Sequence, residues 1–183
     1  MCKDDILSPS EFLVSNIDLL PRRGRVLDVA MGYGRNAVYM AKMGYSVKGV
    51  DISQDAVAGA LNLAGKHGVQ IEARRVDLEK RYQIDQNYYD IIICFNYLQR
   101  NLISSMKKGI RNGGLIVYET FIEDQYKFGR PKNPDHLLKN NELLRMFEDF
   151  RCLRYREGII DGVKAVAGIV AEKVDTISSL KRE

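Results

Sequence analysis

Short apolar runs alternate with amphipathic segments along the first two thirds of the chain. The run after Asp90 is apolar throughout and predicts a strand at 89–95, of the kind that is buried on both faces in the centre of a sheet. Other apolar or β-branched runs predict strands at 25–30, 46–50, 69–75 and 115–120. Helical spacing predicts helices at 9–20, 34–43, 53–66 and 97–110. This alternation is typical of a largely parallel sheet with helices on both faces.

The last third of the chain has a different pattern. Residues 119–141 hold two of the four prolines and show no clear period. Because such a long irregular segment in a compact domain is usually functional, we expect it to form a lid on the substrate side. A predicted helix at 141–148 and predicted strands at 152–157 and 163–173 follow. The link between these two strands is so short that they must form an antiparallel hairpin.

Together these elements predict an α/β fold. We expect a Rossmann-like, doubly wound, mostly parallel seven-stranded sheet with an antiparallel C-terminal hairpin and helices on both faces. A chain of 183 residues has room for one sizeable core. We therefore expect a single domain over 1–183, with an N-terminal helix within 1–24 and a polar tail at 175–183.

Composition and charge narrow the class of protein. Apolar residues make up 45% of the chain and charged residues 28%, and the net charge is +4. The basic residues are scattered, whereas nucleic-acid binding usually needs a dense basic stripe. Cys2, Cys94 and Cys152 are odd in number and widely spaced, which argues against both a disulfide framework and a zinc site. With neither a signal-peptide pattern nor a membrane-spanning stretch, we expect a cytoplasmic monomer or weak dimer without a metal.

The most informative segment joins the first predicted strand to the second predicted helix. Val26-Leu27-Asp28-Val29-Ala30-Met31-Gly32-Tyr33-Gly34 is an apolar run that carries an acid and ends in a glycine turn. The next apolar run leads to Asp51. In α/β sheets the glycines let the backbone approach a nucleoside, and the acid accepts hydrogen bonds from ribose hydroxyls. The pattern therefore predicts a ligand that contains a nucleoside.

Two cofactors fit this pattern, a nicotinamide dinucleotide and S-adenosylmethionine (SAM). Gly32-x-Gly34-x-x-Ala37 with Asp51 matches the dinucleotide fingerprint, in which alanine can replace the third glycine. Asp28 favours SAM, because a carboxylate beside the turn attracts an ammonium and a sulfonium but does nothing for a pyrophosphate at a helix N-terminus. Tyr33 is also bulky for a turn that must hold phosphates. We predict SAM, with a nicotinamide oxidoreductase as the less favoured alternative.

The order of elements and three motifs resemble the class I SAM-dependent methyltransferases over nearly the whole chain. The segment 26–34 resembles the first motif of that family, Asp51 its ribose-binding acid, and Val76-Asp77-Leu78 its third motif. Asn112-Gly113-Gly114 resembles the turn before its fifth strand, with Asn112 in place of a proline. Further segments are similar to small bacterial methyltransferases grouped with tellurite-resistance enzymes, namely 34–37, 95–100, 118–121 and 129–134.

This resemblance implies a cofactor site along one edge of the sheet. Asp51 would bind the ribose, Asp77 would contact the adenine amino group, and Ile52 and Leu78 would enclose the adenine. The full set of predicted cofactor-binding residues is Asp28, Ala30, Gly32, Tyr33, Gly34, Asn36, Asp51, Ile52, Asp77, Leu78, Phe95 and Asn96.

The residues just past the fourth strand should face the sulfonium, and Tyr97 and Arg100 are candidate catalytic residues there. Arg100, one helical turn along from Asn96, could bind an anionic acceptor, or it could pair with Glu119 or Glu123. His136, in the irregular segment, is a candidate general base or a solvent-exposed loop residue. Asn96-Tyr97 lacks the proline pair of enzymes that methylate exocyclic amines of DNA bases or glutamine, which disfavours that acceptor class.

We therefore expect a SAM-dependent methyltransferase that acts on a small molecule and releases S-adenosylhomocysteine (SAH). The resemblance points to a thiol or a selenium- or tellurium-type nucleophile as acceptor. An RNA or protein methyltransferase is an alternative, supported by the positive net charge. A non-catalytic SAM-binding sensor or activating subunit is an alternative of another class. No membrane partner is expected.

Overall fold

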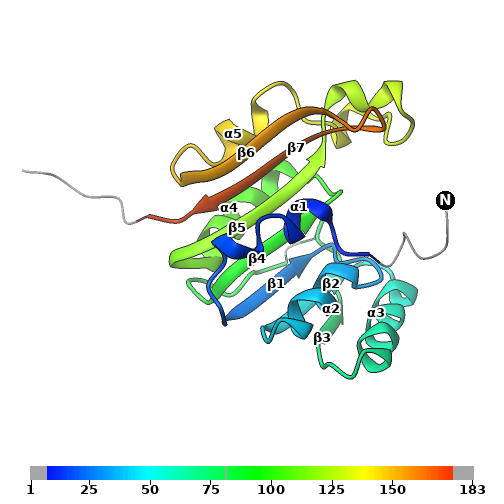
Figure 1. Ribbon diagram of the computed structural model, residues 1–183, viewed down its shortest axis with the longest axis vertical. Helices are drawn as coiled ribbons and strands as arrows, with labels where there is room; N and C mark the ends of the chain where they lie inside the picture. Colours follow the sequence, from blue (N-terminus) through cyan, green and yellow to red (C-terminus); the bar gives the residue numbers. More distant parts are fainter. Residues whose placement is uncertain (1–7, 81, 175–183) are drawn as a thin grey trace, which may run out of the picture.

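The structure is a computed structural model that describes residues 8–80 and 82–174. A seven-stranded sheet runs through it in the order β3-β2-β1-β4-β5-β7-β6 (Figure 1). The first five strands are parallel, and β7 lies antiparallel between β5 and β6. The predicted fold class is confirmed. The strands are β1 (Arg25–Val29), β2 (Ser46–Asp51), β3 (Glu72–Arg75), β4 (Tyr89–Phe95), β5 (Ile110–Phe121), β6 (Arg151–Ile160) and β7 (Lys164–Glu172).

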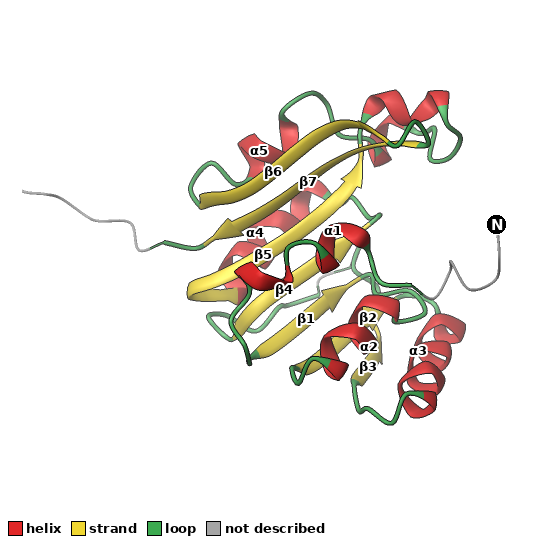
Figure 2. Ribbon diagram, viewed as in Figure 1, coloured by secondary structure: helices red, strands yellow, loops and turns green. Residues whose placement is uncertain are grey.

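Helices cover both faces of the sheet (Figure 2). On one face, α1 and α2 contribute Phe12 and Met40 to an apolar cluster with the side chains of β4 and β5. On the other face, α4 and α5 contribute Met106 and Leu143 to a second cluster. The α-helices are α1 (Glu11–Val14), α2 (Arg35–Lys42), α3 (Gln54–Lys66), α4 (Ile103–Gly109) and α5 (Glu142–Met146). Short 3-10 turns are η1 (Ile17–Leu19), η2 (Arg100–Leu102), η3 (Glu123–Lys127) and η4 (Pro134–His136).

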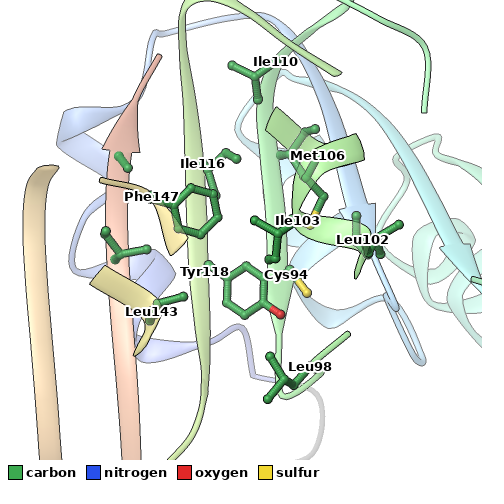
Figure 3. Packing of buried hydrophobic residues seen from close by; sticks show 14 of the residues in the cluster. Cys94, Leu98, Leu102, Ile103, Met106, Ile110, Ile116, Tyr118, Leu143 and Phe147 are labelled. Atoms are coloured by element: carbon green, nitrogen blue, oxygen red, sulfur yellow. The ribbon is translucent and has the colours of Figure 1, made fainter. Parts of the chain in front are cut away.

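The second cluster holds the ends of β4 and β5 in place. Figure 3 shows Tyr118 of β5 beside Cys94 of β4, with Leu98 below it and Phe147 above it. Tyr118 and Phe147 are both fully buried, and burial of an aromatic side chain of this size stabilises the fold by about 1.5–3 kcal/mol. The carboxyl end of β4 is thereby held against β5, which matters because this end borders the candidate site.

The predicted helix at 9–20, and with it the single helix expected within 1–24, is wrong as a continuous element. The described part of this stretch forms α1 and then η1, with Asn16 between them. The side-chain amide of Asn16 donates a hydrogen bond to the carbonyl oxygen of Phe12 at 2.8 Å. Such a side-chain bond competes with the backbone bond that would continue the helix. The helix also starts two residues later than predicted, at Glu11 rather than at residue 9.

The predicted helix at 97–110 begins only at Ile103. Asn96 has a φ of +57° and Gln99 is extended, so a helix cannot begin at these residues. The Tyr118 hydroxyl donates to the carbonyl oxygen of Tyr97 at 2.7 Å, which fixes this non-helical path from a neighbouring strand. The fifth strand is also longer than predicted and starts before the glycine pair, with Gly113 at a φ of +73° within it.

The segment 119–141 is tied to the sheet at several points. β5 continues to Phe121, and Leu137 and Leu138 are buried. The Gln125 side chain accepts a hydrogen bond from the Ala165 amide at 2.8 Å and donates one to the Arg130 carbonyl at 3.2 Å. The predicted tail at 175–183 lies outside the described residues. Within the described ranges, no helix combines the length and apolar character that a bilayer crossing requires.

Candidate functional site

The candidate site lies at the carboxyl ends of β1 and β4, which are neighbours in the sheet. The chain leaves β1 toward α2 on one face and leaves β4 toward α4 on the other, so a crevice opens between the two connections. A cavity of about 360 Å³ lies there. A second cavity, of about 160 Å³, lies beside it toward β2 and β3. Ala30 and Tyr97 line both cavities, so the two form adjoining parts of one cleft.

The predicted residues gather around this cleft. Of the twelve predicted cofactor-binding residues, only Gly34 lines neither cavity. The larger cavity is lined by Asp28, Ala30, Met31, Gly32, Tyr33, Arg35, Asn36, Phe95, Asn96 and Tyr97. The smaller cavity is lined by Ala30, Asp51, Ile52, Asp77, Leu78, Glu79 and Tyr97.

The glycine turn leaves bare backbone facing the larger cavity. Gly32 has a φ of +56°, and a Cβ added there would meet nothing within 4 Å. Gly34 serves a different purpose, because a Cβ added there would lie 2.6 Å from the Cβ of Ala60 on α3. The first glycine therefore keeps space open for a ligand. The second permits close packing of α2 against α3.

Asp28 is buried beside the turn and has an unmet hydrogen-bonding need. Its Oδ2 is the one buried side-chain oxygen or nitrogen without a hydrogen-bond partner in the described chain. Burial raises the pKa of Asp28 from 3.8 to about 8, and the Ala37 amide and the Arg35 charge offset only part of this effect. A buried unpaired carboxylate oxygen is unfavourable unless a donor or a cation satisfies it. The site therefore suits a ligand with a positively charged donor.

Asp51 and Asp77 border the smaller cavity as preoriented acceptors. The two carboxylate oxygens of Asp51 accept hydrogen bonds from the Gly32 amide at 2.8 Å and the Ser53 amide at 2.9 Å. The carboxylate of Asp77 accepts from the Glu79 amide at 3.1 Å and pairs with Lys80 at 3.3 Å. Desolvation opposes ionisation of Asp77, but these partners hold its pKa below the usual value. Each acid keeps free lone pairs that can accept from hydroxyl or amino groups.

Tyr97 lies where the two cavities meet. Burial raises its pKa to about 12, so the phenol stays neutral. The preceding Asn96 donates its amide to the Glu119 carbonyl at 2.9 Å from its left-handed conformation. Non-glycine residues in that conformation cost about 1–2 kcal/mol and are held by the surrounding structure, often at functional sites. Ala30, across the cleft, also has a positive φ, of +54°.

The structure does not bring Arg100 or His136 to the cleft, and neither lines a cavity of it. The Arg100 guanidinium pairs with Glu142 at 2.6 Å and donates to the carbonyls of Asp135 and Leu137, each at 2.9 Å. The partner is thus Glu142 of α5, and not Glu119 or Glu123 as the sequence suggested. His136 is exposed in η4.

Met31, Arg35 and Glu79 line the cleft but were not in the predicted set. Met31 lies inside the motif at 26–34, Arg35 opens the helix after that motif, and Glu79 follows Leu78, so their places in the chain were the signals that could have found them. Arg35 also donates to the Ser8 carbonyl at 2.9 Å, and the Asn36 side chain accepts from the Ser10 amide at 2.7 Å. The start of α2 therefore binds the N-terminal segment as well as bordering the cleft.

A charged cluster lies at the end of β5, near Arg35. Glu119 is buried and pairs with Arg156 of β6 at 2.5 Å and with Lys164 of β7 at 3.5 Å. Arg156 also stacks over the Phe12 ring, 4.8 Å from its centroid. Burial lowers the pKa of Arg35, and Asp28 and Glu119 act in the opposite direction. Three cations thus surround one buried glutamate here. Across the described ranges, no three histidine, cysteine or acidic side chains gather in a way that could hold a metal ion.

The chain is similar in sequence to known methyltransferases. The family model for the methyltransferase domain matches residues 26–114. A protein named hemagglutinin 1 from Eikenella corrodens is 26% identical over 141 residues, 74% of this chain and 46% of that protein. A probable SAM-dependent methyltransferase, TehB from Haemophilus influenzae, is 28% identical over 143 residues, 74% of this chain and 49% of that protein. The chain thus spans about half the length of these relatives.

A solved structure agrees with the sequence matches. The crystal structure of TehB from Haemophilus influenzae aligns with a TM-score of 0.72 at 21% identity, over 89% of this chain and 61% of that one. This likeness shows a shared fold. Together, the domain match, the sheet order and the fold show that the chain is similar to class I SAM-dependent methyltransferase domains and resembles TehB.

Proposed function

We propose that the protein transfers a methyl group from SAM to a small-molecule acceptor, with the amino-acid half of SAM in the larger cavity and its adenosine half in the smaller one. The observation that carries this proposal is the unpartnered Oδ2 of buried Asp28. An ammonium group would satisfy it, and SAM carries one. The open space beside Gly32 would accept the body of the cofactor.

The roles of the remaining residues follow from their contacts. Asp51, held by the Gly32 and Ser53 amides, would accept hydrogen bonds from the ribose hydroxyls. Asp77 would accept one from the adenine amino group, and exposed Ile52 and buried Leu78 would enclose the adenine ring. Phe95, Asn96 and Tyr97 would border the sulfonium, because they line the cavity at the end of β4.

Bound SAM supplies an electrophilic methyl group on a positively charged sulfur. The task of the protein is to align an acceptor behind that methyl group and to exclude water. Buried Phe95 and the neutral phenol of Tyr97 suit this task, since neither competes as a nucleophile. The segment 119–141, which continues from β5 at the same edge of the sheet, would cover the acceptor side.

The shortage of a free general base among the lining residues favours an acceptor that arrives as an anion or with a free lone pair. Among the lining residues Asp28 alone has a pKa raised toward neutrality, and it would be engaged by the cofactor. Arg35 lines the larger cavity and is a cation there that could attract an anionic acceptor. A thiolate or a selenium- or tellurium-type anion needs no general base. We therefore infer a soft, small anion as the acceptor.

A methyl-transfer assay tests this proposal. The protein would be incubated with methyl-labelled SAM and, separately, with small thiols, selenite, tellurite, RNA and a protein mixture. The expected result is labelled small-molecule product and SAH with at least one of the first three. Labelling of RNA or protein alone would overturn the small-molecule reading. Tight SAM binding without transfer to any acceptor would favour a non-catalytic SAM-binding protein.

A further inference from the structure

One glutamine connects the two halves of the cleft without lining either cavity. The Oε1 of Gln99 accepts a hydrogen bond from the Tyr97 hydroxyl. Its Nε2 donates to the carbonyl oxygen of Leu78 at 2.8 Å. Leu78 lines the smaller cavity, whereas Tyr97 lines both. Gln99 therefore joins the turn after β4 to the loop after β3.

The backbone of Tyr97 is fixed independently of Gln99. Its carbonyl accepts from the Tyr118 hydroxyl at 2.7 Å, and the Cys94 sulfur lies 3.8 Å from the same oxygen. Tyr118 is itself fully buried in the cluster that Figure 3 shows. With the backbone held from β4 and β5, the contact with Gln99 determines where the phenol hydroxyl points.

This contact also determines what the hydroxyl can offer to a ligand. A phenol has one proton to donate and lone pairs that accept. Because Gln99 takes the proton, the oxygen can act toward the cleft only as an acceptor. The raised pKa of Tyr97 keeps that proton in place across the neutral range. The methyl hydrogens of a sulfonium are positively polarised and can form weak C–H···O contacts with such an oxygen.

We propose that Gln99 is a positioning residue that orients the Tyr97 oxygen as an acceptor for the sulfonium methyl group at the junction of the two cavities. This inference rests on the proposed function, because it assumes that SAM occupies the cleft. SAM and SAH differ only in the methyl group and its charge. The ratio of their affinities therefore reports on this contact, whereas a change in local stability alone would weaken both ligands equally.

The test is calorimetric titration of four proteins with SAM and with SAH: wild type, Gln99→Met, Tyr97→Phe and the double variant. Gln99→Met keeps the length of the side chain and removes both hydrogen bonds. We expect it to lower the preference for SAM over SAH by about threefold to fivefold, the scale of one weak C–H···O contact. In the Tyr97→Phe background the same change should have no further effect on the preference. Gln86→Met, at an exposed glutamine away from the cleft, is the matched control.

Each outcome is decisive. An unchanged preference in Gln99→Met, or an equal loss of SAM and SAH affinity, would overturn the positioning role. If Gln99→Met does not fold, Gln99→Asn and Tyr97→Phe carry the test. The shorter asparagine side chain stays uncharged but cannot reach both the Tyr97 hydroxyl and the Leu78 carbonyl, so Gln99→Asn should lower the preference for SAM as Tyr97→Phe does. If the wild type binds neither ligand, the proposed function fails, and this result is distinct from a failure of the role of Gln99.

Discussion

Replacement of Asp28 by asparagine should change stability and cofactor affinity in opposite directions. The substitution keeps the shape of the side chain and its bond to the Ala37 amide, and it removes the buried charge. Burial raises the pKa of Asp28 from 3.8 to about 8. Each pKa unit corresponds to ~1.4 kcal/mol, so ionised Asp28 destabilises the ligand-free fold by an amount on the order of 5 kcal/mol. An unpartnered asparagine amide costs only about 1–3 kcal/mol.

The sign and the pH range follow from proton binding. The folded protein holds the Asp28 proton more tightly than the unfolded chain, so wild-type stability falls as the pH rises from about 4 to about 8. Asp28→Asn lacks this loss. We therefore expect the ligand-free variant to be more stable at pH 8 by roughly 2 kcal/mol, or about 5 °C in Tm. The gain should disappear below about pH 3, where the carboxyl group is neutral in both states.

The same variant should bind SAM at least tenfold more weakly, because a hydrogen bond to a charged group is worth about 1.5–3 kcal/mol. Differential scanning calorimetry at several pH values and isothermal titration measure the two effects on the same protein. Asp55→Asn removes an exposed acid that lines neither cavity and is the matched control. A lower Tm at pH 8, or an unchanged SAM affinity, would refute the reasoning about Asp28.

Substitutions in the glycine turn, at Asp51 and at Arg100 separate effects on SAM binding from effects on the fold. Gly32→Ala should weaken SAM binding more than tenfold and cost only about 1–2 kcal/mol of stability for its positive φ. Gly34→Ala should mainly lower the Tm, because the added Cβ meets Ala60. Equal Tm losses in the two variants would contradict this division of roles. Asp51→Ala should weaken SAM and SAH alike by at least tenfold in titration, since it removes the acceptor for the ribose hydroxyls, and unchanged affinity would remove the ribose assignment. Arg100→Ala should leave SAM affinity intact and speed hydrogen exchange at 135–142, because it removes the hydrogen bonds to two carbonyls and the ion pair with Glu142. Lost SAM affinity with unaltered exchange would mean that Arg100 belongs to the cofactor site after all.

The cofactor cleft could be predicted because its residues are local to strand ends. Asp28, Gly32 and Asp51 each follow or interrupt an apolar run, and parallel strands bring such positions to one edge. The strand at 89–95 was predicted with its observed bounds, because five apolar residues follow Asp90 without interruption, and all seven of its residues are buried.

The errors arose where a distant side chain decides the local backbone. The helix predicted from 97 fails because Tyr118, on the next strand, bonds to the Tyr97 carbonyl. Arg100 was placed near the acceptor because spacing along a helix suggested it, but the helix is absent there and its partner Glu142 is distant in sequence. Periodicity reports the preferences of a segment, and it contains no information on such long-range bonds.

The most direct test of the account is calorimetric titration of the wild-type protein with SAM, SAH and NAD. The account predicts micromolar binding of SAM and SAH and none of NAD, with proton release on SAM binding at pH 7, because Asp28 must ionise to pair with the ammonium. Binding of NAD without SAM would contradict it and would assign the glycine turn and Asp51 to a dinucleotide.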